Sequence, residues 1–504
     1  MSATGVDASM AASSTEPLEA VKAQSITAGA VRLGSSQVVR RICRVVFLLV
    51  AARALGPYTF GLYALMFSVI EVFAVISGAG FMELMTREIA RSPRSATRLW
   101  VSLTGLRMAY LALLIALALG VLFKLGYPGS TLMIAGLFSL ALFPRAIVEL
   151  TQGLLRGLRC FGPFLILEVI QGCVLLGMGF ALLHQGKGLP GAIWAEVGAA
   201  GCTAAAALWM LVQRVEGGWG GGISWRETLQ RTFVFNCWPL LVNLYDRFDV
   251  ILLAKLVGER VAGIYAVPYR AFGMFQIFPY GIMGSSLPGL CAGEWNESRR
   301  EEFHRLLGWL FAGAVFLVLV TLLFADQAVR LFLGPAYLDS ALAMKILIWA
   351  VVPAFLNNGM NTLLLARNRE RVLMRTAGVC LAANLTANLL LIPRYSFVAA
   401  AVVTILTELL LFTQNVFLVR PFLGAWPWPR GWYRTSLSFG ALLGAALLIP
   451  GMTSLPRFGV SLAVVAVFAF LLLYMGLLPA PGMSGLLRKV SGWADLSRRS
   501  RLSA

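Results

Sequence analysis

The chain has 504 residues, of which 59% are hydrophobic and only 13% charged. Soluble proteins carry about 25% charged residues, so this composition excludes an ordinary soluble protein and predicts an all-α polytopic membrane protein. The formal net charge is +19. Because the Lys and Arg residues are scattered among many short segments, we expect membrane-flanking loops and no binding to nucleic acid.

Long apolar runs predict about fourteen transmembrane helices, since a helix needs roughly 20 apolar residues to cross a bilayer. The expected spans are 28–53, 60–80, 98–123, 130–154, 163–184, 189–212, 232–256, 262–290, 305–330, 341–366, 372–393, 397–419, 434–451 and 458–478. They group into two pseudo-symmetric six-helix lobes, 25–214 and 231–421, and an additional helix pair, 430–480. The remaining parts are a disordered tail without a signal peptide at 1–24, a Gly-rich linker at 215–230 and a basic tail at 481–504.

A repeated motif indicates that the two lobes are related. Arg53 to Leu65 recurs as Lys255 to Val267, with every matching pair 202 positions apart. The repeat matches Gly56 to Gly258 and Gly61 to Gly263, which predicts a tight hairpin between two spanning helices in each half. Such internal duplication is typical of transporters.

The distribution of arginine predicts the topology. Loops after even-numbered spans are rich in arginine and loops after odd-numbered spans are not, so both termini should be cytoplasmic. The connections between the predicted spans are at most about 25 residues long. They leave no room for a nucleotide-binding domain or a large catalytic loop. We therefore expect a protein that is not an enzyme. The seven cysteines and two histidines are too widely spaced to predict a metal site, and no cofactor is expected beyond a coupling proton or Na⁺.

Ionisable side chains at bilayer depth are the candidate functional residues, because they are costly there unless they have a role. Arg44 should lie roughly 18 Å below the first hairpin, near the midplane of the membrane. The repeat offset pairs Arg44 with Asp246, and Arg41 with Asn243. The full set of candidates also includes Glu71, Arg107, Asp249 and Arg270.

Two interpretations of these charges stay open. In the first, they form ion pairs that hold the helices in register. In the second, Arg41, Arg44, Arg107, Arg270 and Asn243 bind an anionic substrate, while Glu71, Asp246 and Asp249 carry a coupling ion or act as counter-charges. Arg145 and Glu149 are four residues apart, which favours a local salt bridge. The asparagines favour hydrogen bonds between helices; they are Asn357, Asn358, Asn361, Asn384 and Asn388.

Three segments resemble one family. They are Ala52 to Leu65, the run from Asp246 to Tyr265, and the run from Asn384 to Glu408. They are similar to helices of the polysaccharide transporter family, the bacterial O-antigen and capsule flippases. That family shares a superfamily with multidrug and toxic-compound extrusion transporters and the lipid II flippase.

The resemblance implies a flippase of the bacterial inner membrane that moves undecaprenyl-diphosphate-linked oligosaccharide by alternating access. Its implied partners are this lipid-linked substrate, membrane lipid and other membrane proteins of lipopolysaccharide or exopolysaccharide assembly. The alternatives are an ion-coupled exporter of small molecules, a membrane-embedded polymerase or glycosyltransferase, and a scaffold without transport. An exporter of cations should have a net acidic cleft, and a polymerase should have an acid–base pair with a substantial loop.

Overall fold

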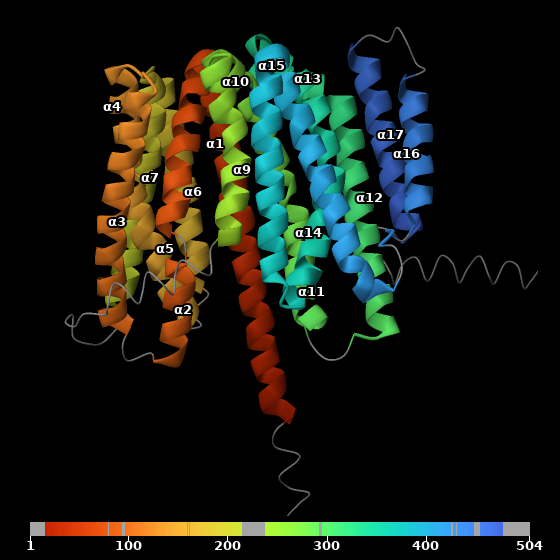
Figure 1. Ribbon diagram of the computed structural model, residues 1–504, viewed down its shortest axis with the longest axis horizontal. Helices are drawn as coiled ribbons and strands as arrows, with labels where there is room; N and C mark the ends of the chain where they lie inside the picture. The colour runs from red at the N-terminus through yellow and green to blue at the C-terminus, as the bar shows by residue number, and fades with distance from the viewer. Residues whose placement is uncertain are drawn as a thin grey trace, which may run out of the picture. The chain divides into compact units, whose positions relative to one another are not determined.

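The computed structural model describes residues 16–78, 80–92, 96–158, 160, 162–213, 237–291, 295–424, 427–429, 431–447 and 454–476, with all of its regular elements helical (Figure 1). This confirms the all-α fold class. Eight of the described helices are long and apolar enough to cross a membrane, and two of these eight contain an internal break. The total of fourteen spans therefore stays a prediction, as do the lobe boundaries.

The first helical element, α1 (Glu16–Gly78), contains the first predicted hairpin. Its backbone is non-helical at Gly56, with φ 72° and ψ 168°, a conformation that a residue with a Cβ rarely adopts. Pro57 follows and starts the second arm, since proline is tolerated in the first turn of a helix. Residues 16–24, expected in a disordered tail, are helical, while 1–15 lie outside the described residues.

The rest of the first half consists of α2 (Phe81–Arg91), α3 (Ala96–Lys124), α4 (Gly129–Ser139), α5 (Leu142–Gly157), α6 (Gly162–His184) and α7 (Gly188–Val212). The sequence predicts a loop between the spans 60–80 and 98–123, and most of this segment is instead the helix α2. Three apolar residues on one face of α2, Phe81, Met85 and Ile89, are buried in a cluster with Leu150 and Leu154 of α5. This amphipathic pattern is the signal that could have predicted the helix.

The second repeat begins with α9 (Cys237–Leu256) and α10 (Glu259–Phe275), joined at Gly258 with φ 123°. Figure 1 shows α10 beside α1, and the two hairpins pack against each other at their glycines. A Cβ at Gly61 would overlap the carbonyl oxygen of Glu259, and a Cβ at Gly263 would overlap that of Pro57. The duplicated glycines thus permit a backbone-to-backbone crossing of the two repeats.

Two hydrogen bonds from repeat-equivalent cations join the repeats near this crossing. Arg53 donates to the carbonyl oxygen of Leu331 at 2.8 Å. Lys255 donates to the carbonyl oxygen of Leu125 at 2.6 Å, and its ammonium lies 5.0 Å from the centre of the Tyr127 ring. Burial, followed by the nearby Glu259, raises the pKa of Tyr127, so this ring stays neutral beneath the cation.

The remaining elements are α11 (Ile277–Cys291), α12 (Glu297–Ala328), the π-helix η2 (Val329–Leu333), the short turns η3 (Pro335–Tyr337) and η4 (Ile348–Ala350), α13 (Leu338–Leu347), α14 (Val351–Ala366), α15 (Glu370–Leu423), α16 (Trp432–Leu447) and α17 (Ser454–Tyr474). The long α15 is broken at Ser396, with φ 56° and ψ −140°, between the two spans predicted there. Phe468 and Leu472 of α17 are buried against Ala312 and Leu319 of α12.

The chain divides into two compact units. Unit 1 comprises Met1–Ile277, Ala328–Leu347 and Arg369–Thr407; unit 2 comprises Phe278–Gln327, Ile348–Asn368 and Glu408–Ala504. All of the charged candidates from the sequence belong to unit 1. The predicted linker 215–230 and tail 481–504 lie outside the described residues.

Candidate functional site: a cluster of arginines

Arg44, on the first arm of α1, is held by a carboxylate of α7. Its Nη1 donates to Oε2 of Glu196 at 2.7 Å, and the Tyr63 hydroxyl donates to the other carboxylate oxygen at 2.8 Å. Glu196 has a side chain only 9% exposed, so its charge requires this pairing. Glu196 is not among the residues that the sequence predicted for the site.

Three arginines converge on the ring of Phe67, on the second arm of α1. The guanidinium carbons of Arg270, Arg44 and Arg247 lie 4.2, 4.9 and 5.2 Å from the ring centre. They come from α10, α1 and α9, so this ring contacts cations of both repeats. All three distances are within the range of cation–π attraction, about 6 Å.

A chain of alternating charges begins one helical turn from Phe67. Arg145 of α5 donates two hydrogen bonds of 2.9 Å, one to each carboxylate oxygen of Glu71. Its Nε lies 3.3 Å from Glu149, which confirms the expected local salt bridge. Glu149 in turn accepts a hydrogen bond from Arg107 of α3. Two candidates, Glu71 and Arg107, are therefore neutralised here by partners on neighbouring helices.

The charges of this region do not balance. Among the described side chains, five arginines (Arg44, Arg107, Arg145, Arg247, Arg270) share three glutamates (Glu71, Glu149, Glu196) through the contacts above. None of the described ion pairs includes Arg247 or Arg270. We call these eight residues the arginine cluster; its described part has an excess of two positive charges. Guanidinium groups donate bidentate hydrogen bonds to phosphates, so the cluster suits an anion.

A second polar centre surrounds Asp249 of α9, which is 1% exposed. Its carboxylate accepts hydrogen bonds from Asn388 at 2.7 Å, Thr404 at 3.0 Å and Tyr265 at 3.3 Å. Asn384 bonds both Asn388 and Thr407, as expected for asparagines between helices. The Oδ1 atom of Asn388 is buried without a described partner. Carboxylate, amide and hydroxyl oxygens are hard donors that suit a small monovalent cation.

Some predicted residues have a different or undescribed environment. The side chains of Asn243 and Asp246 lie outside the described residues, so the expected Arg44–Asp246 relationship stays a prediction. Arg41 is half-buried on α1, three residues before Arg44. In unit 2, Asn357 donates to Glu408 at 2.9 Å, and Asn415 bonds both Asn357 and Asn361, which confirms the expected interhelical role.

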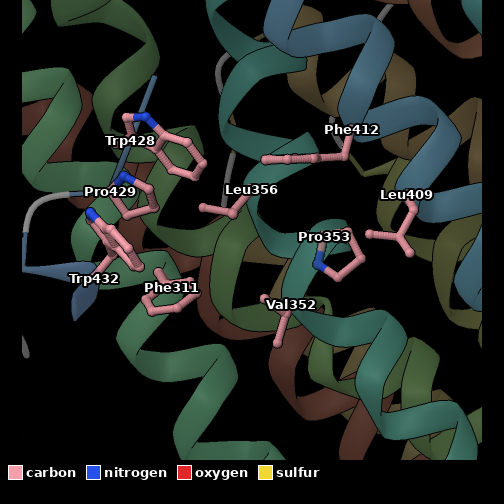
Figure 2. A pocket seen from close by; sticks show the side chains of 9 residues that line it. All are labelled: Phe311, Val352, Pro353, Leu356, Leu409, Phe412, Trp428, Pro429 and Trp432. Atoms are coloured by element: carbon pink, nitrogen blue, oxygen red, sulfur yellow. The ribbon is translucent and has the colours of Figure 1, made fainter. Parts of the chain in front are cut away.

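Unit 2 also contains a partly open cavity of about 160 Å³ (Figure 2). Its lining is apolar or aromatic throughout and consists of Phe311, Val352, Pro353, Leu356, Leu409, Phe412, Trp428, Pro429 and Trp432. Trp428 and Trp432 stack at 5.6 Å on one side of it. This apolar lining suits hydrocarbon.

A family model described as "Polysaccharide biosynthesis protein" matches residues 26–292, just over half of the chain. The chain belongs to this family. The matched residues include all eight members of the arginine cluster and Asp249. A comparison with curated proteins gives no match.

Solved structures of low sequence identity have the same fold as this chain. "Lipid II flippase MurJ, inward closed conformation" has 12% identity over 89% of this chain and 99% of its own, with a TM-score of 0.69. An inward-facing multidrug resistance MATE family transporter of the MOP superfamily has 15% identity over 77% and 96%, with a TM-score of 0.66. A MOP superfamily transporter from Pyrococcus furiosus has 16% identity over 78% and 96%, with a TM-score of 0.58. Family and fold together confirm the expected resemblance, and the chain is a multi-pass membrane protein.

Proposed function

We propose that the protein is a flippase for a diphosphate-linked lipid oligosaccharide of bacterial polysaccharide assembly. The observation that carries this proposal is the excess of two positive charges in the described arginine cluster. A diphosphate esterified at both ends carries two negative charges, so it would neutralise that excess. The saccharide and polyprenyl parts are covalently attached to the diphosphate, so they would move with it.

The arginines would bind the diphosphate while Glu196 and Glu71 compete for them. Arg44 exchanges Glu196 for a phosphate oxygen when substrate enters, and returns to Glu196 when substrate leaves. Such exchange keeps Arg44 paired with a counter-charge when the transporter is empty. Alternating exposure of the cluster to the two membrane faces would move the headgroup from the cytoplasmic to the outer face of the inner membrane, with both termini cytoplasmic.

Asp249 would couple this movement to a gradient of protons or Na⁺. Three neutral donors surround its carboxylate, and the buried Oδ1 of Asn388 supplies a further oxygen nearby. A cation arriving here changes the charge of α9, the helix that also carries Arg247. This connection gives a physical route from ion binding to the arginine cluster.

The test uses the purified full-length protein in liposomes with a fluorescent polyprenyl-diphosphate oligosaccharide, and it measures transfer between leaflets. Arg270→Gln removes a cluster charge and should reduce transfer at least about tenfold, because one charge-assisted contact is worth roughly 1.5–3 kcal/mol. Arg91→Gln is the matched control, since Arg91 is 59% exposed and lies on α2 outside the cluster. Transfer at the wild-type rate by Arg270→Gln contradicts the proposal; transport of a cationic drug in its place favours the exporter.

A further inference from the structure

Phe67 is an apolar residue at the centre of the arginine cluster. Its ring is 5% exposed and lies within 5.2 Å of the guanidinium carbons of Arg44, Arg247 and Arg270. Since these arginines belong to α1, α9 and α10, a single ring contacts cations from three helices. Phe67 also has an equivalent in the second repeat, Tyr269, at the same offset of 202 as the hairpin glycines.

The orientation of the ring is set by other aromatic side chains. Tyr63 stacks on it at 6.4 Å with an interplanar angle of 22°, and Phe138 of α4 meets it edge-on at 5.8 Å. Both neighbours are themselves buried. Tyr63 and Phe138 therefore hold the ring in position without help from the arginines, and the arginines pack against the ring.

A ring holds a guanidinium differently from a carboxylate. It attracts the cation through its quadrupole, but it neither cancels the charge nor accepts the strong N–H hydrogen bonds. Within the described part of the chain, no ion pair includes Arg247 or Arg270. The contact with the Phe67 ring does not use the guanidinium N–H groups, so it leaves them available to an anion. A carboxylate in this position would instead compete with an anionic substrate.

We propose that Phe67 is a positioning residue, which gathers the guanidinium groups of Arg44, Arg247 and Arg270 around one ring so that they bind two linked phosphates together. This inference rests on the proposed function, because it assigns a role within the same site. Its consequence is selectivity: gathered arginines bind a diphosphate through both phosphates, whereas arginines that are spread apart bind one phosphate at a time.

The experiment compares binding of inorganic pyrophosphate and inorganic phosphate to purified full-length variants by calorimetry. Phe67→Leu keeps an apolar side chain but removes the ring, and it should weaken pyrophosphate binding about tenfold while leaving phosphate binding nearly unchanged. Phe67→Tyr keeps the ring and should restore the preference for pyrophosphate. In the liposome assay, Phe67→Leu should raise KM more than it lowers kcat.

Phe60→Leu is the matched control, because Phe60 lies on the same face of α1 two turns away, is buried, and stacks on Tyr63 at 5.8 Å. It loses the same aromatic area without touching the three arginines, so its preference for pyrophosphate should stay. Equal losses of both anions in Phe67→Leu, or the same loss in Phe60→Leu, would show a general packing role and overturn the inference.

Failure of the two proposals is distinguishable. If the wild-type protein prefers pyrophosphate and Phe67→Leu keeps that preference, the role of Phe67 is overturned and the flippase remains. If Phe67→Leu loses the preference but the wild-type protein transfers no lipid-linked saccharide, the anion site and the role of Phe67 stand while the substrate is wrong. A wild-type protein without any preference for pyrophosphate overturns the inference directly.

Discussion

Tyr63 and Tyr265 occupy equivalent positions in the two repeats, and each donates a hydrogen bond to a buried carboxylate. The Tyr63 hydroxyl lies 2.8 Å from Glu196, and the Tyr265 hydroxyl lies 3.3 Å from Asp249. The two carboxylates differ in their other partners, since Glu196 holds Arg44 while Asp249 accepts from Asn388 and Thr404. The equivalent tyrosines therefore serve two chemically different centres, whose carboxylates come from non-equivalent helices, α7 and α9.

Removing the charge of Glu196 should strengthen anion binding and slow transport. In Glu196→Gln, Arg44 loses its counter-charge, so the described cluster gains one further unit of positive charge. We expect a lower Tm without ligand and about tenfold tighter binding of pyrophosphate, consistent with a charge–charge contribution of a little over 1 kcal/mol. The ligand-induced rise in Tm, measured for both proteins, checks this directly.

Glu168→Gln provides the control for Glu196→Gln. Glu168 is also buried, but its cationic partner is Arg40, at 3.6 Å, whose side chain is 45% exposed, and it accepts a hydrogen bond from Gln152. Pyrophosphate should stabilise this variant no more than the wild-type protein. If both variants gain the same stabilisation, the effect comes from total charge rather than from release of Arg44.

Neutralising Asp249 should uncouple transport from the ion gradient. Asp249→Asn keeps the size of the side chain but removes the charge that a proton or Na⁺ would meet. We expect a gradient to accelerate transfer by the wild-type protein and to leave transfer by Asp249→Asn unchanged, with leaflet transfer measured with and without each gradient. Asp339→Asn, at an exposed position, should respond as the wild-type protein does. A full gradient response by Asp249→Asn would contradict the coupling role.

The sequence predicted the parts of this fold that depend on local chemistry. Gly56 and Gly258 could be identified because a backbone with positive φ needs glycine between two apolar runs. The offset of 202 also identified Gly61 and Gly263 as equivalent before their close approach was visible. Depth along a helix follows from the rise per residue, so Arg44 and Glu71 could be recognised as membrane charges.

The partners of those charges could not be predicted from the sequence. Which carboxylate meets Arg44 depends on the rotation of α1 and α7, and an apolar helix in lipid carries little amphipathic signal to fix its rotation. The contact of Phe67 with the arginines could not be predicted for another reason: one aromatic residue in an apolar run is normally a packing residue. Its repeat equivalence to Tyr269 was the available signal, and it concerns position rather than contact.

Adding a methyl group at the hairpin crossing should destabilise the protein. Both Gly61→Ala and Gly263→Ala would place a Cβ against backbone of the other repeat, which cannot move away as a flexible side chain can. We expect each variant to lose about 1–3 kcal/mol, measured as a lower Tm in detergent. Gly105→Ala on α3 is the control: nothing lies within 4 Å of its added Cβ, and alanine favours a helix by about 0.5–1 kcal/mol. A crossing variant as stable as Gly105→Ala would mean that the repeats do not pack so closely.

The two cations that join the repeats should hold the hairpin end closed. Arg53→Met and Lys255→Met each remove one hydrogen bond, to Leu331 or Leu125, but keep a long apolar side chain. In a background without the native cysteines, spin labels at Tyr58 and Leu338, which are 61% and 44% exposed, report the separation of the hairpin from the start of α13. Opening of this end should lengthen the distance between the two labels. We expect the double variant to populate this longer distance about tenfold more than the wild-type protein, since each exposed charged hydrogen bond contributes roughly 0.5–1.5 kcal/mol.

The single variants of Arg53 and Lys255 should have separate, additive effects on this distance. Because Arg53 and Lys255 each donate one bond across the repeats, each single variant should give about half the free-energy change of the double variant, provided that the two bonds act independently. Lys124→Met, at an exposed position beside Leu125, removes a nearby charge without either bond and should leave the distance distribution unchanged. An unchanged distribution in the double variant would show that the glycine crossing alone keeps this end closed, and that opening at this end does not require these bonds to break.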